Sequence, residues 1–221
     1  MKVSKKKNPS LPLKDEPVIR SFTIADLRAV EEGTSIEGHP AVYDQKANIY
    51  GCFYEVIERG AFDECDFDDV LFSVNHDLRK IPLARSRRNN GNSTMFLQPD
   101  EKGLYFKADL DAEGNAEAKS LYSAVGRRDI DGMSFIFYVK EERWADLDKD
   151  MPVRHVLKIK KVVEVSAVNF PFYKGTDINA RDQHALDNAA RVLENARSTL
   201  DNEKKGRLET LRLKTQILMK G

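Results

Sequence analysis

Ser134 is a polar residue in an otherwise apolar segment, and its hydroxyl could act as a nucleophile. It lies in the run Asp131–Phe137, whose other central positions are apolar. A hydroxyl in such surroundings needs a hydrogen-bond partner. The partner can be a backbone group, which makes Ser134 structural. It can instead be a general base, which activates the hydroxyl for attack, with Gly132 allowing a substrate to approach closely.

His76 is the histidine whose surroundings best suit such a base, among four histidines in the chain. Residues 70–76 read as a strand, in which alternate residues share one face, so the imidazole is expected at the end of an apolar row. The neighbours Asn75 and Asp77 make the strand end polar, and reactive side chains are often displayed in such places. A lone histidine is also commonly structural or exposed.

Glu164 is a carboxylate in the middle of the valine-rich run Val162–Val168. A half-buried carboxylate is costly unless it is paired. One explanation is an exposed strand face that carries Glu164 together with Ser166. The other is a carboxylate that orients an imidazole and stabilises its protonated form, as the acid does in a Ser-His-acid triad. The residues alone do not show that Ser134, His76 and Glu164 meet.

The elements that must position these residues are mostly short strands. The chain has 221 residues, of which 41% are hydrophobic and 33% charged, enough for one domain with a sizeable core. Alternating or apolar runs bounded by turn residues predict strands, and helical spacing predicts a helix over 116–127. The pattern favours a mainly β or α+β domain with a β-barrel-like core. The predicted strands are 18–24, 36–43, 70–76, 94–98, 103–110, 133–139, 153–159 and 162–168.

Composition divides the chain into three parts. Residues 1–17 are rich in Lys and Pro without periodicity, which predicts a flexible basic leader. Residues 18–178 are the predicted folded domain. Residues 179–221 contain no Pro and predict a helix over 181–220, with Gly206 as a point of interruption. Leucines at intervals of seven favour self-association or a partner helix, and an amphipathic helix packed on its own domain is the alternative.

Several other functional classes find little support in the sequence. The 36 basic and 36 acidic side chains cancel, and the short basic clusters lack interleaved aromatic residues, which argues against a nucleic-acid-binding protein. Neither a signal peptide nor a membrane span is predicted, and the two cysteines are expected to be reduced thiols of an intracellular protein. No metal-binding motif occurs, so no metal or other cofactor is expected.

Several short segments follow one another in a characteristic order and spacing. They are Ile36–Gly38, Ala41–Tyr43, Tyr54–Phe62, Asn75–Asp77, Pro82–Arg85, Gly103–Leu104, Gly132–Phe135 and Val163–Val168. In this order and spacing they resemble the prohead maturation protease family of tailed bacteriophages over residues 18–178. The early family motif commonly reads Gly-Tyr-Ala, whereas this chain has His39-Pro40 between Gly38 and Ala41, which affects local loop shape.

This resemblance implies a serine endopeptidase with the fold of the herpesvirus assembly proteases, a mainly β barrel edged by helices. It implies Ser134 as the nucleophile and His76 as the general base, because they occupy the family's Gly-(Leu/Met)-Ser and Asn-His-Asp segments. Glu164 follows as the orienting acid from its place in the Glu-Val-Ser segment. The herpesvirus enzymes use a second histidine instead, so His155 is the competitor for the third role.

The resemblance also implies the protein's partners and setting. Family members cleave scaffold proteins and capsid-protein extensions, and often themselves, inside an immature capsid in the host cytoplasm. A homo-oligomer, for which fold analogy suggests a dimer, is expected. The alternative from a different class is a non-enzymatic capsid scaffold or assembly protein, which accounts for the helical tail and leaves the three polar residues unexplained.

The helical tail over 179–221 is expected to act as a docking or scaffold-like segment that is removed during maturation, because its composition and leucine spacing differ from those of the domain. Mass spectrometry of mature particles should therefore find the protease domain without these residues. Full-length tail in mature particles would contradict its removal.

Overall fold

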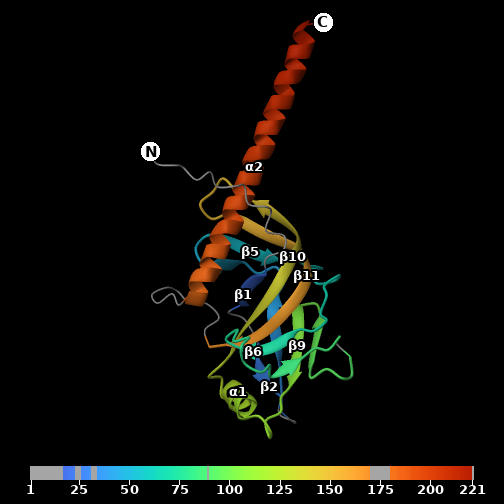
Figure 1. Ribbon diagram of the computed structural model, residues 1–221, viewed down its shortest axis with the longest axis vertical. Coiled ribbons are helices and arrows are strands. Elements are labelled where there is room, and N and C mark those ends of the chain that lie inside the picture. Colours follow the sequence, from blue (N-terminus) through green and yellow to red (C-terminus); the bar gives the residue numbers. More distant parts are fainter. Residues whose placement is uncertain (1–16, 23–25, 31–33, 89, 170–179, 221) are drawn as a thin grey trace, which may run out of the picture.

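The described part of the protein is built mainly from strands, with two helices. The computed structural model describes residues 17–22, 26–30, 34–88, 90–169 and 180–220, and Figure 1 shows their arrangement. Of the predicted leader, only Pro17 lies within the described residues. The described strands form two sheets.

The larger sheet has seven strands and is mixed, with the order β1-β10-β11-β5-β4 and with β6 and β7 paired beside β11. The smaller sheet has four strands in the antiparallel order β2-β3-β9-β8. The strands of the larger sheet are β1 (Val18–Phe22), β4 (Ala47–Ile49), β5 (Phe53–Ile57), β6 (Leu71–Val74), β7 (Ala84–Arg85), β10 (Gly132–Ala145) and β11 (Val153–Val168). Those of the smaller sheet are β2 (Arg28–Ala29), β3 (Ser35–Val42), β8 (Met95–Pro99) and β9 (Gly103–Asp109).

The antiparallel pair β10 and β11 is the longest feature of the larger sheet. The prediction of separate strands over 153–159 and 162–168 was wrong, because β11 runs through both without a break. The pairing of β10 with β11 shifts register several times in its middle, as it does at β-bulges, so the two strands stay paired on both sides of this irregular stretch. One edge of β11 pairs in parallel with β5 near its start and with β6 near its end. This arrangement brings the end of β6 beside the end of β11.

The hydrophobic core contains buried side chains from both sheets. Phe72 of β6 meets Phe106 of β9 with ring centroids 4.9 Å apart. Phe135 and Phe137 of β10 are both fully buried and stack at 4.4 Å. At Gly103, β9 approaches β3 so closely that an added Cβ would lie 2.0 Å from the carbonyl oxygen of Ala41. A side chain there would therefore break the pairing of the two strands.

Helix α1 (Ala116–Gly126) agrees with the prediction over 116–127. The Asn115 side chain caps its first turn by accepting from two backbone N–H groups, which leaves fewer unsatisfied donors there. Ala118, Leu121 and Val125 recur at helical spacing and are buried, and the helix packs against β2 and β3.

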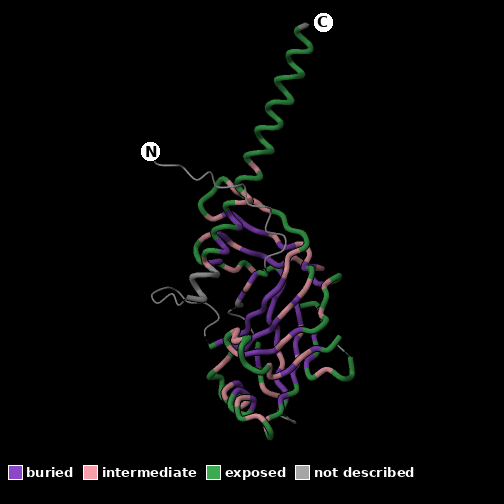
Figure 2. Tube along the Cα trace, viewed as in Figure 1, coloured by how far each residue is buried: buried purple, intermediate pink, exposed green. Residues whose placement is uncertain are grey.

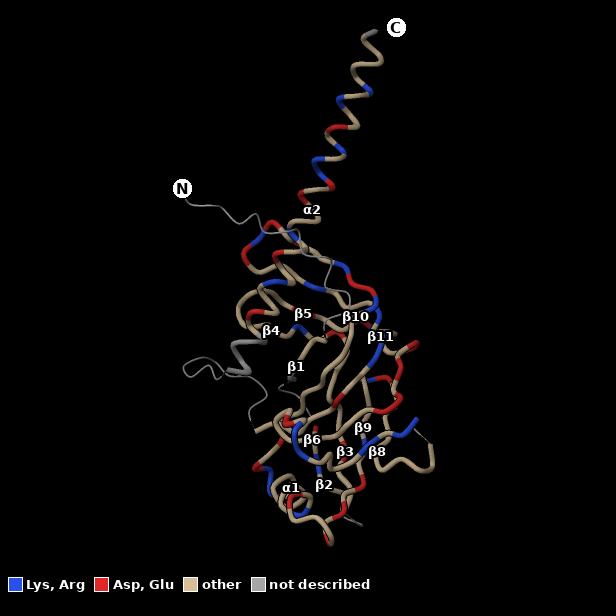
Figure 3. Tube along the Cα trace, in the orientation of Figure 1, with Lys and Arg blue, Asp and Glu red and all other residues tan. Residues whose placement is uncertain are grey.

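Helix α2 (Ala180–Lys220) has two parts with different surroundings. In its first half, Ala189 and Leu193 pack against Ile49 and Phe53 of β4 and β5. Residues 201–219 are exposed, and Figures 1 and 2 show this part projecting away from the sheets. Both acidic and basic residues occur along it in Figure 3. The helix continues through Gly206 without interruption.

The expectation of a mainly β, α+β chain with a helical tail is confirmed. The two sheets of the described residues do not close into a barrel, and the likeness to the herpesvirus proteases remains a prediction. Among the described residues, neither helix contains a stretch apolar enough and long enough to cross a membrane.

A buried network of charges joins four neighbouring strands of the larger sheet. Glu55 of β5 is 1% exposed and accepts from Arg20 of β1 at 2.6 Å and from Arg154 of β11 at 3.0 Å. Arg154 also donates to Glu142 of β10 at 2.9 Å. Burial alone would raise the pKa of Glu55, but the charges of the two arginines outweigh it and hold the pKa below its ordinary value.

Replacing Glu55 by Gln should destabilise the fold by about 3–5 kcal/mol at pH 7, because Arg20 and Arg154 then stay buried without their countercharge. A carboxylate with a lowered folded pKa stabilises the fold above its unfolded pKa, and this contribution is lost as pH falls through the folded pKa. The difference in unfolding free energy between wild type and Glu55→Gln should therefore shrink as the pH is lowered below about 4.

Urea denaturation at several pH values measures this difference. The matched control is Glu64→Gln, which removes a carboxylate from an exposed ion pair with Lys140 and should leave stability nearly unchanged. Equal stability of Glu55→Gln and wild type at pH 7 would contradict the role given to the network.

Candidate active site

Ser134, His76 and Glu164 lie within hydrogen-bond distance of one another in a row. The Nε2 atom of His76 is 2.6 Å from Oγ of Ser134, and its Nδ1 atom is 2.7 Å from Oε2 of Glu164. Ser134 belongs to β10, Glu164 to β11, and His76 follows the end of β6. The three side chains are far apart in the sequence, so strand pairing is what brings them together.

The register of three strands places the polar residues on one face of the larger sheet. Ser134 of β10 is paired with Ser166 of β11, and Ser166 is paired with Ser73 of β6. Glu164 lies two residues before Ser166 and therefore points to the same face. Phe135, which follows Ser134, points to the opposite face and enters the core. The site is thus the polar side of strands whose other side is apolar.

His76 reaches this face through a turn rather than through strand alternation. The prediction that it ends an apolar row of a strand over 70–76 was wrong, because β6 ends at Val74. Asn75 and His76 both adopt left-handed conformations, with φ of 52° and 56°. These conformations are uncommon for residues other than glycine, and they redirect the chain so that the imidazole lies over the face that carries Ser73. The N–H of Asn75 donates to the carbonyl of Ala167 at 2.9 Å and holds the turn against β11.

Burial differs among the three residues. Glu164 is 0% exposed, and its two oxygens contact different donors: Ser73 at Oε1 and His76 at Oε2. The alternative of an exposed face carrying Glu164 and Ser166 was therefore wrong, since Ser166 is also 0% exposed. A carboxylate in this position depends on its hydrogen bonds to the protein, because it is shielded from bulk water.

Ser134 combines both arrangements that its sequence allowed. It is fully buried, its Oγ contacts the imidazole of His76, and it also lies 2.8 Å from the backbone carbonyl oxygen of Arg20. A hydroxyl has one hydrogen, so it donates to one of these acceptors at a time. The carbonyl of Arg20 and the hydroxyls of Ser73 and Ser166 were not predicted as parts of the site. Their contacts arise from register, for which the sequence carries no local signal.

The other histidines have different partners. His155 lies in the first part of β11, beside Val56 of β5, and its Nδ1 is 2.5 Å from Oε1 of Glu58. His39 lies between two carboxylates, those of Asp26 and Asp100. The side chain of His184 lies outside the described residues. Within those residues, no group of three or more His, Cys, Asp or Glu side chains is arranged to hold a metal ion.

The two cysteines have surroundings that favour the protonated thiol. Burial raises the pKa of Cys52, and burial raises the pKa of Cys65 to about 12. Because the thiolate is the nucleophilic form of cysteine, neither side chain is prepared for attack at neutral pH. This chemistry favours Ser134 over a cysteine as the nucleophile.

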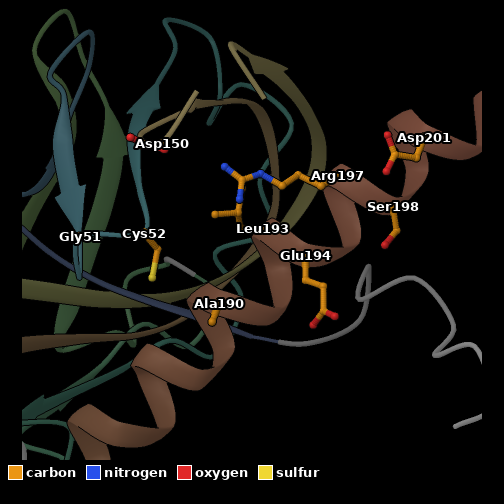
Figure 4. A pocket seen from close by; sticks show the side chains of 9 residues that line it. All are labelled: Gly51, Cys52, Asp150, Ala190, Leu193, Glu194, Arg197, Ser198 and Asp201. Atoms are coloured by element: carbon orange, nitrogen blue, oxygen red, sulfur yellow. The ribbon is translucent and has the colours of Figure 1, made fainter. Parts of the chain in front are cut away.

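A hollow of about 450 Å³ lies between the first half of α2 and the turns at Gly51 and Asp150. Figure 4 shows Arg197, Glu194 and Cys52 around it. Arg197 is bound to the backbone carbonyl of Lys149 at 2.8 Å. The hollow is lined by none of Ser134, His76 and Glu164, and burial raises the pKa of its Cys52 thiol, which disfavours the reactive thiolate.

Comparison with protein families gives a match. The family model of the caudovirus prohead serine proteases matches residues 23–190, which is more than half of the 221-residue chain. The chain belongs to this family. The match spans all three residues of the row and extends into the first part of α2. No curated protein and no solved structure gives a significant match.

Proposed function

We propose that this prohead protease family member is a serine endopeptidase that cleaves scaffold proteins and capsid-protein extensions during procapsid maturation. In this proposal Ser134 is the nucleophile, His76 the general base and Glu164 the orienting acid. One observation supports it most directly: the imidazole of His76 lies 2.6 Å from the hydroxyl of Ser134 and 2.7 Å from the buried carboxylate of Glu164. The family membership supports the same chemistry.

The geometry suits a general-base mechanism. Glu164 accepts the hydrogen of Nδ1, which leaves the lone pair of Nε2 directed at the hydroxyl of Ser134. As Oγ attacks the scissile carbonyl carbon, His76 takes its proton, and the carboxylate stabilises the imidazolium. His76 then protonates the leaving amine. A water molecule, deprotonated by the same imidazole, releases the acyl group from Ser134.

The carbonyl of Arg20 gives Ser134 a second acceptor in the resting protein. The hydroxyl must donate to His76 rather than to this carbonyl before attack, which requires only a rotation about the Cβ–Oγ bond. Ser134 is fully buried whereas the side chain of His76 is 16% exposed. Any reagent or substrate that reacts with Ser134, a small probe included, must therefore uncover its Oγ as it binds.

Glu164 fits the third role better than His155. The carboxylate of Glu164 contacts the imidazole of His76, whereas His155 is bound to Glu58. His155 lies in the part of β11 that pairs with β5, whereas Glu164 lies in the part that pairs with β6. His155 is thus proposed to be structural.

The same proposal includes the setting of the reaction. We place the enzyme inside the procapsid in the host cytoplasm, with the scaffold and major capsid proteins as substrates and partners, and with self-cleavage as a further reaction. The exposed part of α2, residues 201–219, supports docking to a helical partner because its Leu208, Leu211 and Leu218 are 52%, 53% and 82% exposed. Dimerisation and the herpesvirus-protease-like fold are further parts of this proposal.

The exposed helix also suits the second candidate function, a non-enzymatic scaffold or assembly protein. A scaffold needs the helix but not the hydrogen-bonded row. Replacement of Ser134 by Ala removes the nucleophile and leaves the helix unchanged, so it separates the two functions.

Co-expression of the chain with its phage's capsid and scaffold proteins should yield cleavage products that are absent with Ser134→Ala, because only the wild-type hydroxyl can form the acyl intermediate. Intact-mass analysis identifies the products and the cleavage sites. Ser120→Ala is the matched control, since Ser120 is exposed on α1 and its hydroxyl donates to the carbonyl of Ala116. Identical fragments from wild type and Ser134→Ala would exclude Ser134 as the nucleophile, and normal shells without fragments would favour the scaffold function.

Glu164→Gln should lower the cleavage rate by about four orders of magnitude, the loss seen when the acid of a serine-protease triad becomes an amide. The amide can donate to Nδ1 and so favours the tautomer whose Nε2 carries the hydrogen and cannot act as a base. His155→Gln should keep the wild-type rate within about threefold, because His155 contacts Glu58 and not the row. A quantitative time course of substrate cleavage measures both, and the reverse ranking would make His155 the third residue.

A further inference from the structure

The face that carries Ser134 contains two more buried hydroxyls, and together they form a closed path of hydrogen bonds with His76. Ser73 of β6 and Ser166 of β11 are paired in register and lie 3.1 Å apart at their Oγ atoms. Ser73 is 6% exposed and Ser166 is 0% exposed. Their positions therefore depend on contacts within the protein.

The direction of each hydrogen bond follows from the number of hydrogens available. The carboxylate of Glu164 only accepts, so Ser73 donates its single hydrogen to Oε1. In the contact between the two serines, the donor is therefore Ser166. The oxygen of Ser166 in turn accepts from the backbone N–H of His76 at 2.9 Å. The weaker alternative for the hydrogen of Ser166 is the carbonyl of Ala167, at 3.4 Å.

This path begins and ends at the same residue. It runs from the backbone N–H of His76 to Ser166, then to Ser73, and then to one oxygen of Glu164. The other oxygen of Glu164 accepts from the imidazole of His76. The backbone N–H and the imidazole of His76 are therefore held by one connected set of hydrogen bonds. Both ends of this set lead to the carboxylate of Glu164.

The conformation of His76 explains why such a path is needed. Its φ of 56° lies in the left-handed region, and the preceding Asn75 is left-handed too. Such backbone conformations cost free energy and persist only where the surroundings hold them. Ser166 holds the N–H of His76, and Ser73 fixes the carboxylate that holds its ring.

We propose that Ser73 and Ser166 are positioning residues that act as one unit to aim the imidazole of His76 at Ser134. This inference rests on the proposed function of the same site. Removal of either hydroxyl breaks the path between the backbone and the carboxylate, so the ring loses its fixed direction while the nucleophile, base and acid all remain.

The test uses the full-length chain and a small fluorophosphonate probe, which forms a bond between Oγ of an activated serine and phosphorus as fluoride leaves and the base takes the proton. Saturation kinetics separate the maximal rate of labelling from the probe concentration that gives half of it. Ser73→Ala and Ser166→Ala should each lower the maximal rate by about 100-fold and leave the half-saturating concentration unchanged, because misdirection of a catalytic group affects the chemical step.

The double variant Ser73→Ala/Ser166→Ala shows whether the two serines act as one unit or contribute independently. For one unit, the double variant should be no slower than the slower single variant, within about threefold. Two independent contacts would multiply to a loss of about 10⁴-fold. A multiplicative loss would overturn the proposal.

The chain offers a matched control for each serine. Ser35 donates to the carboxylate of Asp109 at 2.6 Å, as Ser73 does to Glu164, but lies in the smaller sheet. Ser86 is fully buried and accepts from the N–H of Val70 at 3.2 Å, as Ser166 does from His76. Ser35→Ala and Ser86→Ala should label at the wild-type rate within about threefold.

Spectroscopy gives a readout that does not depend on turnover. The Nδ1–H proton of His76 should appear as a low-field proton resonance that is absent from His76→Ala, because it is shared with a buried carboxylate. It should persist in the two control variants and be shifted or lost in Ser73→Ala and Ser166→Ala. Where an alanine variant lacks the circular dichroism of the folded chain, the corresponding Ser→Cys variant replaces it, because a thiol fills the space but is a weak hydrogen-bonding group.

The outcomes test the proposed protease function and the positioning role of the two serines separately. If wild type is not labelled at Ser134, the proposed function fails and the positioning role fails with it. If wild type is labelled but Ser73→Ala and Ser166→Ala react within about threefold of it, the protease stands and the positioning role is excluded. A single-variant loss that is matched by Ser35→Ala or Ser86→Ala would also exclude it.

Discussion

The buried carboxylate of Glu164 is the constraint on which the rest of the site depends. A negative charge without exposure to water is tolerated only where donors surround it, and this carboxylate has two: the hydroxyl of Ser73 and the imidazole of His76. Satisfying it fixes the ring of His76, and the fixed ring directs Nε2 at Ser134. The need of the buried carboxylate for hydrogen-bond donors thus also orients His76, the proposed base.

The sheet supplies the rigidity that this arrangement needs. Ser134 and Glu164 lie on paired strands, and β6 joins the same ladder along the other edge of β11. Below them the aromatic side chains of Phe72 and Phe135 fill the core. A displacement of β6 relative to β11 would move His76 away from both partners. The buried network around Glu55 joins β1, β10, β11 and β5, and β1 carries the carbonyl that contacts Ser134.

The parts of the fold that could be predicted are those with local signals. The alternation in 94–98 and 103–110 and the spacing in 116–127 correspond to the hairpin of β8 and β9 and to α1. The continuity of β11 was missed because bulges let one strand pass through a stretch whose pattern changes. The closure of a barrel depends on pairing between distant strands, about which local patterns carry no information.

The candidate site divides in the same way. Ser134 and Glu164 could be singled out because each is polar within an apolar run, and His76 because it follows an apolar run at a polar strand end. The turn that carries His76 could not, since consecutive left-handed residues without glycine have no reliable sequence signal. Ser73 and Ser166 gave no signal because a serine in a strand is ordinary. Their importance comes from cross-strand register, which exists only once β6 lies beside β11.

The most direct test of the central claim is to locate the bond that a fluorophosphonate forms with the full-length chain. Peptide mass spectrometry after labelling should find the adduct on Ser134, and His76→Ala and Glu164→Gln should form little of it in the same time, because the hydroxyl is activated only through the oriented imidazole. An adduct on another residue, or undiminished labelling of Ser134 in His76→Ala, would contradict the account.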